Sequence, residues 1–98
     1  MRKAGNERRR ETAPDPELWR YFKDGRIERM PASRDARLRL LRFLALQFEP
    51  DRSYDEGAVN RLLSRFDEDF ASLRRHLVDE GLLVRAAGIY RRAPAAGA

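Results

Sequence analysis

The chain has 98 residues, 42% of them hydrophobic, with a formal net charge of +5 and no cysteine. This length predicts one domain with one modest core, and the lack of cysteine excludes disulfides and thiolate chemistry. No run of about 18 apolar residues is present and no apolar segment follows the basic N-terminus, so we expect neither a membrane span nor a secretory signal. These features together predict a cytoplasmic protein.

The positive charge is concentrated at the N-terminus, where residues 1–14 hold five basic and two acidic side chains. We predict that this segment is a disordered basic arm, that residues 15–92 form the single domain, and that residues 93–98 form a disordered tail. A basic excess of this kind indicates nucleic acid or another polyanion as a candidate partner.

The N-terminal part of the domain is rich in aromatic residues. Large apolar side chains over 18–22 predict a short helix that starts near Pro16. These side chains could stack on bases or pack the segment onto the core. Asp24-Gly25 predicts a turn, and the alternation of charged and apolar residues over 26–30 predicts a short strand.

Two amphipathic helices are expected next. The first begins at a Ser33 cap and runs to about Phe48, and its wide apolar face predicts that it is the central helix. The second is capped by Asp55 or by Ser53, and its apolar stripe extends to Phe66.

The C-terminal part predicts a third helix and a hairpin. Asp67 is the expected cap of this helix, Leu73 and Leu77 face inward, and Gly81 ends it in a left-handed conformation. Residues 82–91 read as two strands around a tight turn. We therefore expect a mainly α fold with a small β-hairpin (α+β), winged-helix-like, with three core helices and a C-terminal two-stranded wing.

No catalytic residue, metal ligand set or cofactor motif is predicted. The single His76 has no serine and acid at an informative spacing, so nucleophilic catalysis is unsupported. The acids at 67–69 fan out around a helix axis and complement its dipole, which is a poor arrangement for a metal. The glycines are isolated, so no phosphate loop exists. We expect a non-enzymatic protein without a small-molecule substrate.

Nucleic-acid binding has candidate residues on the third helix and on the wing. Serine, arginine and histidine can reach base edges or phosphates, and the basic arm could follow the duplex backbone. The candidates are Ser72, Arg75, His76, Arg85, Arg91 and Arg92.

The acids at 67–69 oppose this prediction, because the N-terminal end of a recognition helix faces phosphate-rich DNA. Either some of them act as caps and turn away, or this helix does not read DNA in the usual pose. The alternative is a protein-interaction or dimerisation module, with a homodimer or a protein partner held by the aromatic N-terminal segment and the third helix.

Three polar residues are assigned to structure. Arg74 lies beside the apolar stripe of the third helix, so we expect it to form a partly buried ion pair with Asp69 or Asp55. Asn60 is expected to hydrogen-bond the connection near residues 66–67.

The stretch from Tyr21 to Arg92 contains several short motifs that belong together. They are Phe22-Lys23-Asp24-Gly25-Arg26-Ile27, Pro31, Arg37-Leu38, Val59-Asn60, Leu73-Arg74-Arg75, Leu77-Val78-Asp79 and Gly81-Leu82-Leu83-Val84-Arg85. In these motifs the stretch resembles the bacterial domain of unknown function 2087 (DUF2087). The resemblance implies a link to bacterial transcriptional regulation, because such domains occur alone or fused to helix-turn-helix regulators of the ArsR type. It supplies no catalytic residues.

Overall fold

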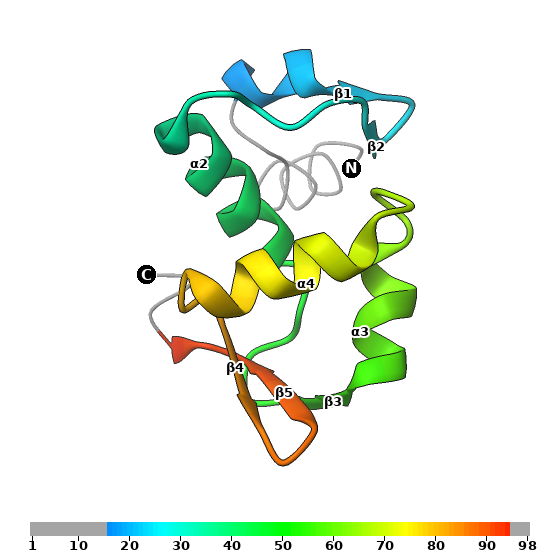
Figure 1. Cartoon of the computed structure of the whole chain (residues 1–98), viewed down its shortest axis with the longest axis vertical. Coiled ribbons are helices and arrows are strands. Elements are labelled where there is room, and N and C mark those ends of the chain that lie inside the picture. The colour runs from blue at the N-terminus through cyan, green and yellow to red at the C-terminus, as the bar shows by residue number, and fades with distance from the viewer. Residues whose placement is uncertain (1–15, 95–98) are drawn as a thin grey trace, which may run out of the picture.

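The computed structural model describes residues 16–94, which form a small α+β fold with two antiparallel sheets (Figure 1). No helix in this range is long and apolar enough to cross a membrane. The elements in chain order are the 3₁₀ helix η1 (Pro16–Tyr21), β1 (Phe22–Lys23), β2 (Arg26–Ile27), α2 (Arg34–Ala45), β3 (Ser53–Asp55), α3 (Glu56–Leu63), α4 (Phe70–Asp79), β4 (Leu83–Ala86) and β5 (Ile89–Arg92).

Helix α2 begins where the sequence predicts and ends earlier. The Ser33 side chain accepts a hydrogen bond from the backbone N–H of Ala36, which satisfies one of the free donors of the first turn. The last residue of α2 is Ala45, so the prediction that the helix runs to Phe48 was wrong. The chain continues as a tighter turn in which Phe48 N–H donates to the Ala45 carbonyl at 3.1 Å, and this turn still delivers the Phe48 ring to the core.

The caps of the next two helices distinguish between the acids in each connection. Asp55 caps α3 by accepting from the Ala58 N–H at 2.8 Å, and Ser53 lies in β3 instead. Asp69 caps α4, so the prediction that Asp67 is the cap was wrong. The Asp67 carboxylate accepts from the Asp69 N–H at 3.0 Å and thereby shapes the turn before the helix.

The C-terminal hairpin belongs to a three-stranded sheet, which corrects the expectation of a two-stranded wing. Strand β3 pairs with β5, and β5 pairs with β4, so the strand order is β3-β5-β4. Tyr54 lies opposite Tyr90, and Arg85 lies opposite Tyr90 on the other side. Because directly opposed residues share one face of a sheet, these three side chains lie on the same face.

A second hairpin, β1–β2, was not expected as such. The turn residues Asp24 and Gly25 both have positive φ, which matches the right-handed twist of short hairpins. The Phe22 ring meets the edge of Phe43 on α2, and Phe43 in turn meets Phe66. The N-terminal aromatic residues thus contribute to packing, with the exception of Trp19, whose residue surface is 56% exposed.

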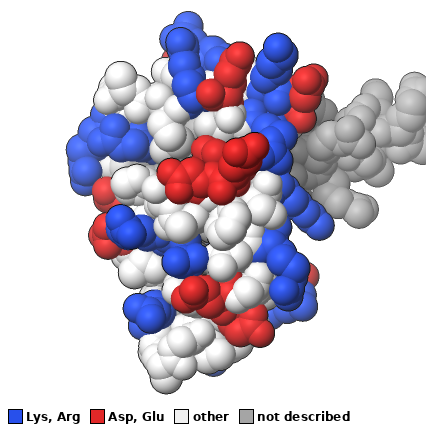
Figure 2. Space-filling model, turned by 45° about the vertical axis from the view of Figure 1, so that its right-hand side comes forward, with Lys and Arg blue, Asp and Glu red and all other residues white. Residues whose placement is uncertain are grey.

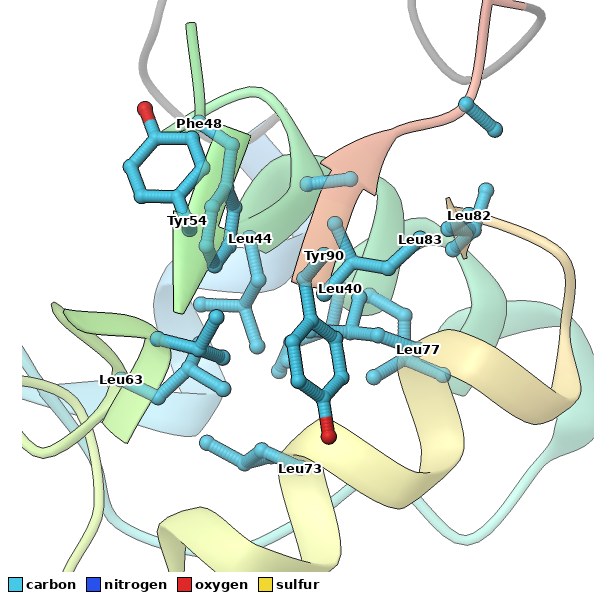
Figure 3. Close-up of a cluster of buried hydrophobic side chains, with 14 of the residues drawn as sticks. Leu40, Leu44, Phe48, Tyr54, Leu63, Leu73, Leu77, Leu82, Leu83 and Tyr90 are labelled. Carbon is cyan, nitrogen blue, oxygen red and sulfur yellow. The ribbon is translucent and has the colours of Figure 1, made fainter. Parts of the chain in front are cut away.

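The core is apolar and lies among α2, α3, α4 and the sheet. Charged side chains of both signs are scattered over the face seen in Figure 2. Inside, leucines from α2, α3 and α4 meet Phe48, Tyr54 and Tyr90 (Figure 3). Ala93 is also buried, and its N–H donates to the Leu82 carbonyl at 3.0 Å. The packed body therefore extends one residue into the expected tail, while the expected arm and residues 95–98 lie outside the described residues.

Gly81 ends α4 in the left-handed conformation, with φ of +74° and no atom near the position of an added Cβ. We expect Gly81→Ala to lower the free energy of unfolding by about 1–2 kcal/mol, because a Cβ is disfavoured in this backbone conformation. Gly57→Ala is the matched control, since Gly57 is helical and its added Cβ meets only side-chain atoms. It should be neutral or stabilising by up to about 1 kcal/mol. Urea denaturation measures the free energy of unfolding of both variants. Equal effects would contradict the conclusion that Gly81 is required by a left-handed backbone conformation.

Candidate functional site

A groove with a volume of about 250 Å³ separates the outer side of α4 from the C-terminal hairpin, and we call it the α4–hairpin groove. In Figure 1 the hairpin projects from one side of α4, next to the N-terminal end of α3. Helix α4 contributes Arg74, Arg75, Val78 and Asp79. The other lining residues are Glu56 from α3, Arg85 from β4 and Tyr90 from β5.

A polar network joins three elements at the groove. Arg74 hydrogen-bonds the Asn60 side chain and lies 3.9 Å from the Glu56 carboxylate, while the Tyr90 hydroxyl donates to Glu56 at 3.2 Å. Arg74 is placed there because it follows the buried Leu73, so its stem runs along the apolar stripe. The side chain of Arg74 is 22% exposed, and its charge is offset within the protein.

The three residues that were predicted to have structural roles have such roles, but with partners other than those predicted. Arg74 and Asn60 are hydrogen-bond partners of each other, and Glu56 takes the place of the expected acid. Asp69 accepts from the Ser72 N–H at 3.4 Å as the helix cap, which leaves it turned toward the backbone. Asn60 was expected at the connection before α4, but the Arg74 guanidinium occupies its side-chain oxygen.

Arg75 and Arg85 line the groove from different elements, α4 and β4. Both residues are exposed, and within residues 16–94 neither forms a salt bridge. Arg85 lies over the Tyr90 ring, with its guanidinium carbon 5.9 Å from the ring centroid. This cation–π contact holds Arg85 on the groove side of the hairpin.

The other predicted nucleic-acid residues do not gather at the groove. Ser72 is half-buried, and its backbone N–H is used by the Asp69 cap, while His76 is exposed outside the lining. Arg91 lies opposite Val84, so it points to the outer face of the sheet, away from Tyr90. Arg92 donates to the Phe48 carbonyl at 3.0 Å and thus ties β5 to the turn that follows α2.

The surface charge is mixed. Figure 2 shows basic and acidic side chains interspersed, with no continuous basic area on the face drawn. At the start of α4, Asp67 and Asp69 both accept backbone hydrogen bonds, which leaves Glu68 as the acid there without such a role among the hydrogen bonds of the described residues. The acidic end of α4 is therefore largely explained by helix capping.

Comparison with known proteins identifies a family. A family model described as an uncharacterized protein conserved in bacteria (DUF2087) covers residues 26–92. The chain belongs to the DUF2087 family. No curated protein and no solved structure matches the chain.

The DUF2087 match runs from the start of β2 to the end of β5, so it includes every residue of the α4–hairpin groove. No role at the site was predicted for four groove residues: Val78 and Asp79 on α4, Glu56 on α3 and Tyr90 on β5. The placement of Glu56 and Tyr90 depends on the register between β3 and β5, and β3 is only three residues long. Asp79 follows Arg75 by four residues on the same side of α4, and this spacing is a sequence signal that could have found it.

Proposed function

We propose that this DUF2087 domain is a bacterial regulatory module of winged-helix type that binds duplex nucleic acid through α4 and the C-terminal hairpin. The observation that carries the proposal is the pair Arg75 and Arg85, which face one groove from the helix and from the wing without salt-bridge partners in residues 16–94. Guanidinium groups in this position suit phosphate oxygens.

The element order supports the winged-helix part of this proposal. Helices α3 and α4 are consecutive and pack on each other, and the hairpin that follows lies beside α4. In helix-turn-helix proteins the second helix of the pair enters the major groove. The capping roles of Asp67 and Asp69 weaken the electrostatic objection, because their carboxylates face backbone donors at the helix start.

Binding should be dominated by phosphate contacts and should therefore depend on salt. In a fluorescence anisotropy titration of the full chain on a labelled duplex, we expect affinity to fall steeply between about 50 and 200 mM salt. Arg75→Glu and Arg85→Glu should each weaken binding by about tenfold or more and reduce the salt slope by about 1.

The matched control is Arg20→Glu. It changes the charge by the same amount on η1, which lies at the opposite end of the molecule from the hairpin in Figure 1. Its binding should stay close to that of the unsubstituted chain. Equal losses in all three variants would indicate a diffuse charge effect, and an unsubstituted chain that does not bind duplex at low salt would contradict the proposal.

The second candidate function is dimerisation. A chain that does not bind DNA would favour this candidate. The observation behind it is the outer face of the sheet, where Val84 is 50% and Ile89 is 40% exposed. Exposed apolar residues beside each other on one sheet face suit contact with a second copy of the chain.

A further inference from the structure

The α4–hairpin groove has a neutral part and a charged rim. The neutral part is the Arg74, Glu56 and Tyr90 network, in which each charged or polar group already has a partner. The rim consists of Arg75 and Asp79 on α4 and of Arg85 on β4. Within residues 16–94 no salt bridge engages any of these three side chains. The rim therefore presents two cations and one anion to whatever enters the groove.

Asp79 is in an electrostatically unfavourable place for structure alone. It is the last residue of α4, where the negative end of the helix dipole repels a carboxylate. It follows Arg75 by four residues, which is the weaker order for an ion pair on a helix, and the two do not pair. The next residue, Glu80, is compensated by Arg34 at 3.3 Å. Asp79 has no such compensation in the described part of the chain and faces the groove.

We propose that the α4–hairpin groove binds a small zwitterionic ligand of the acidic amino-acid class. Arg75 and Arg85 would take its carboxylates, because a guanidinium fork matches the two oxygens of a carboxylate. Asp79 would take its ammonium group. The rim carries two positive charges and one negative charge. An acidic amino acid carries the complementary set, two carboxylates and one ammonium group.

The size of the groove and its apolar part agree with this class. A volume of about 250 Å³ is below the range of drug-sized pockets, which begins at about 300 Å³. Val78 offers an apolar contact for a short methylene chain between the charged groups. A single phosphate ion inside the groove would pair with the two arginines and place a further negative charge opposite Asp79, so a small, purely anionic ligand should bind there more weakly than a zwitterion.

This inference goes beyond DNA binding and stands without it, although the two share Arg75 and Arg85. The test is a titration of the ¹⁵N-labelled full chain, without DNA, with L-glutamate, glutarate and inorganic phosphate. Glutarate keeps both carboxylates and lacks the ammonium group, and phosphate supplies an anion alone. We expect L-glutamate to shift the amide signals of α4 and β4 around the groove, and to bind at least about tenfold more tightly than either comparison probe.

Two variants assign the contacts. Arg85→Gln should weaken L-glutamate binding by about tenfold or more, and Asp79→Asn should remove the preference for L-glutamate over glutarate. Arg20→Gln on η1 is the control and should bind like the unsubstituted chain. Glutarate or phosphate binding as tightly as L-glutamate in the unsubstituted chain would overturn the proposal, as would L-glutamate binding weaker than about 10 mM. Both of these results are measured on the unsubstituted chain without DNA, so they test the ligand site independently of DNA binding.

Discussion

Leu73→Ala should lower the free energy of unfolding by about 2–5 kcal/mol. Leu73 is 2% exposed on α4 and belongs to the cluster formed by α2, α3, α4 and the sheet. The substitution removes buried methyl groups and leaves a cavity that the neighbouring helices fill only in part. Because small domains have total stabilities of about 5–15 kcal/mol, a loss of this size is a large fraction of the whole.

The measurement is urea denaturation followed by circular dichroism, with the midpoint and the slope fitted separately. Val84→Ala is the control, because Val84 is 50% exposed on the outer face of the sheet and its truncation should change the free energy by about 0.5 kcal/mol or less. A loss at Leu73 no larger than that at Val84 would show that α4 turns a different face to the core.

The helices could be predicted from the sequence because their apolar stripes are long enough to fix a phase. On α4, Leu73 and Leu77 are four residues apart and both are buried. The caps were harder to place because neighbouring residues share the same chemistry. Ser53 and Asp55 can both cap a helix, as can Asp67 and Asp69. Strand pairing decides between the first two, and a local turn decides between the second two. Ser53 is used by β3, and Asp67 is used by the turn before α4.

The strands could be predicted only where a turn signal framed them. The C-terminal hairpin has a tight turn at Ala87-Gly88, and Asp24-Gly25 marked a turn without revealing that Phe22–Lys23 pairs back. Strand β3 has three residues, too few for an alternation pattern to appear, and its existence depends on β5. Two strands were accordingly predicted where the sheet has three.

The side on which a groove residue lies could likewise be predicted on the helix but not on the strands. Arg75 was predicted as a surface contact because it lies outside the apolar stripe of α4, and it lines the groove. Arg85 and Arg91 were equivalent in the sequence, yet the strand register places only Arg85 on the face of Tyr90. Arg92 was grouped with them, and its guanidinium bonds the Phe48 carbonyl instead. The side of a helix on which a residue lies follows from the sequence of that helix alone. The face of the sheet on which a strand residue lies depends also on how the strand pairs with its neighbours.

Phe48→Ala should have an effect of similar or greater size, a loss of about 3–5 kcal/mol in the free energy of unfolding. The residue is 0% exposed, and its ring meets the Tyr54 ring edge-on with centroids 5.0 Å apart. It lies between the end of α2 and β3, so its truncation removes buried area and the aromatic contact together. Urea denaturation measures the loss, and Trp19→Ala is the control because Trp19 is 56% exposed. A loss at Phe48 as small as that at Trp19 would contradict the packing.

The consequences of Phe48→Ala should also be unequal across the fold. The Phe48 ring contacts Tyr54 of β3, and Tyr54 lies opposite Tyr90 of β5, so this side chain supports two strands of the sheet at once. The β1–β2 hairpin is held instead by Phe22 against Phe43 on α2. Native-state hydrogen exchange should therefore show a larger loss of protection in β3 and β5 than in β1 and β2. Uniform loss would mean that the domain opens only as a whole and that Phe48 has no special hold on the sheet beside the groove.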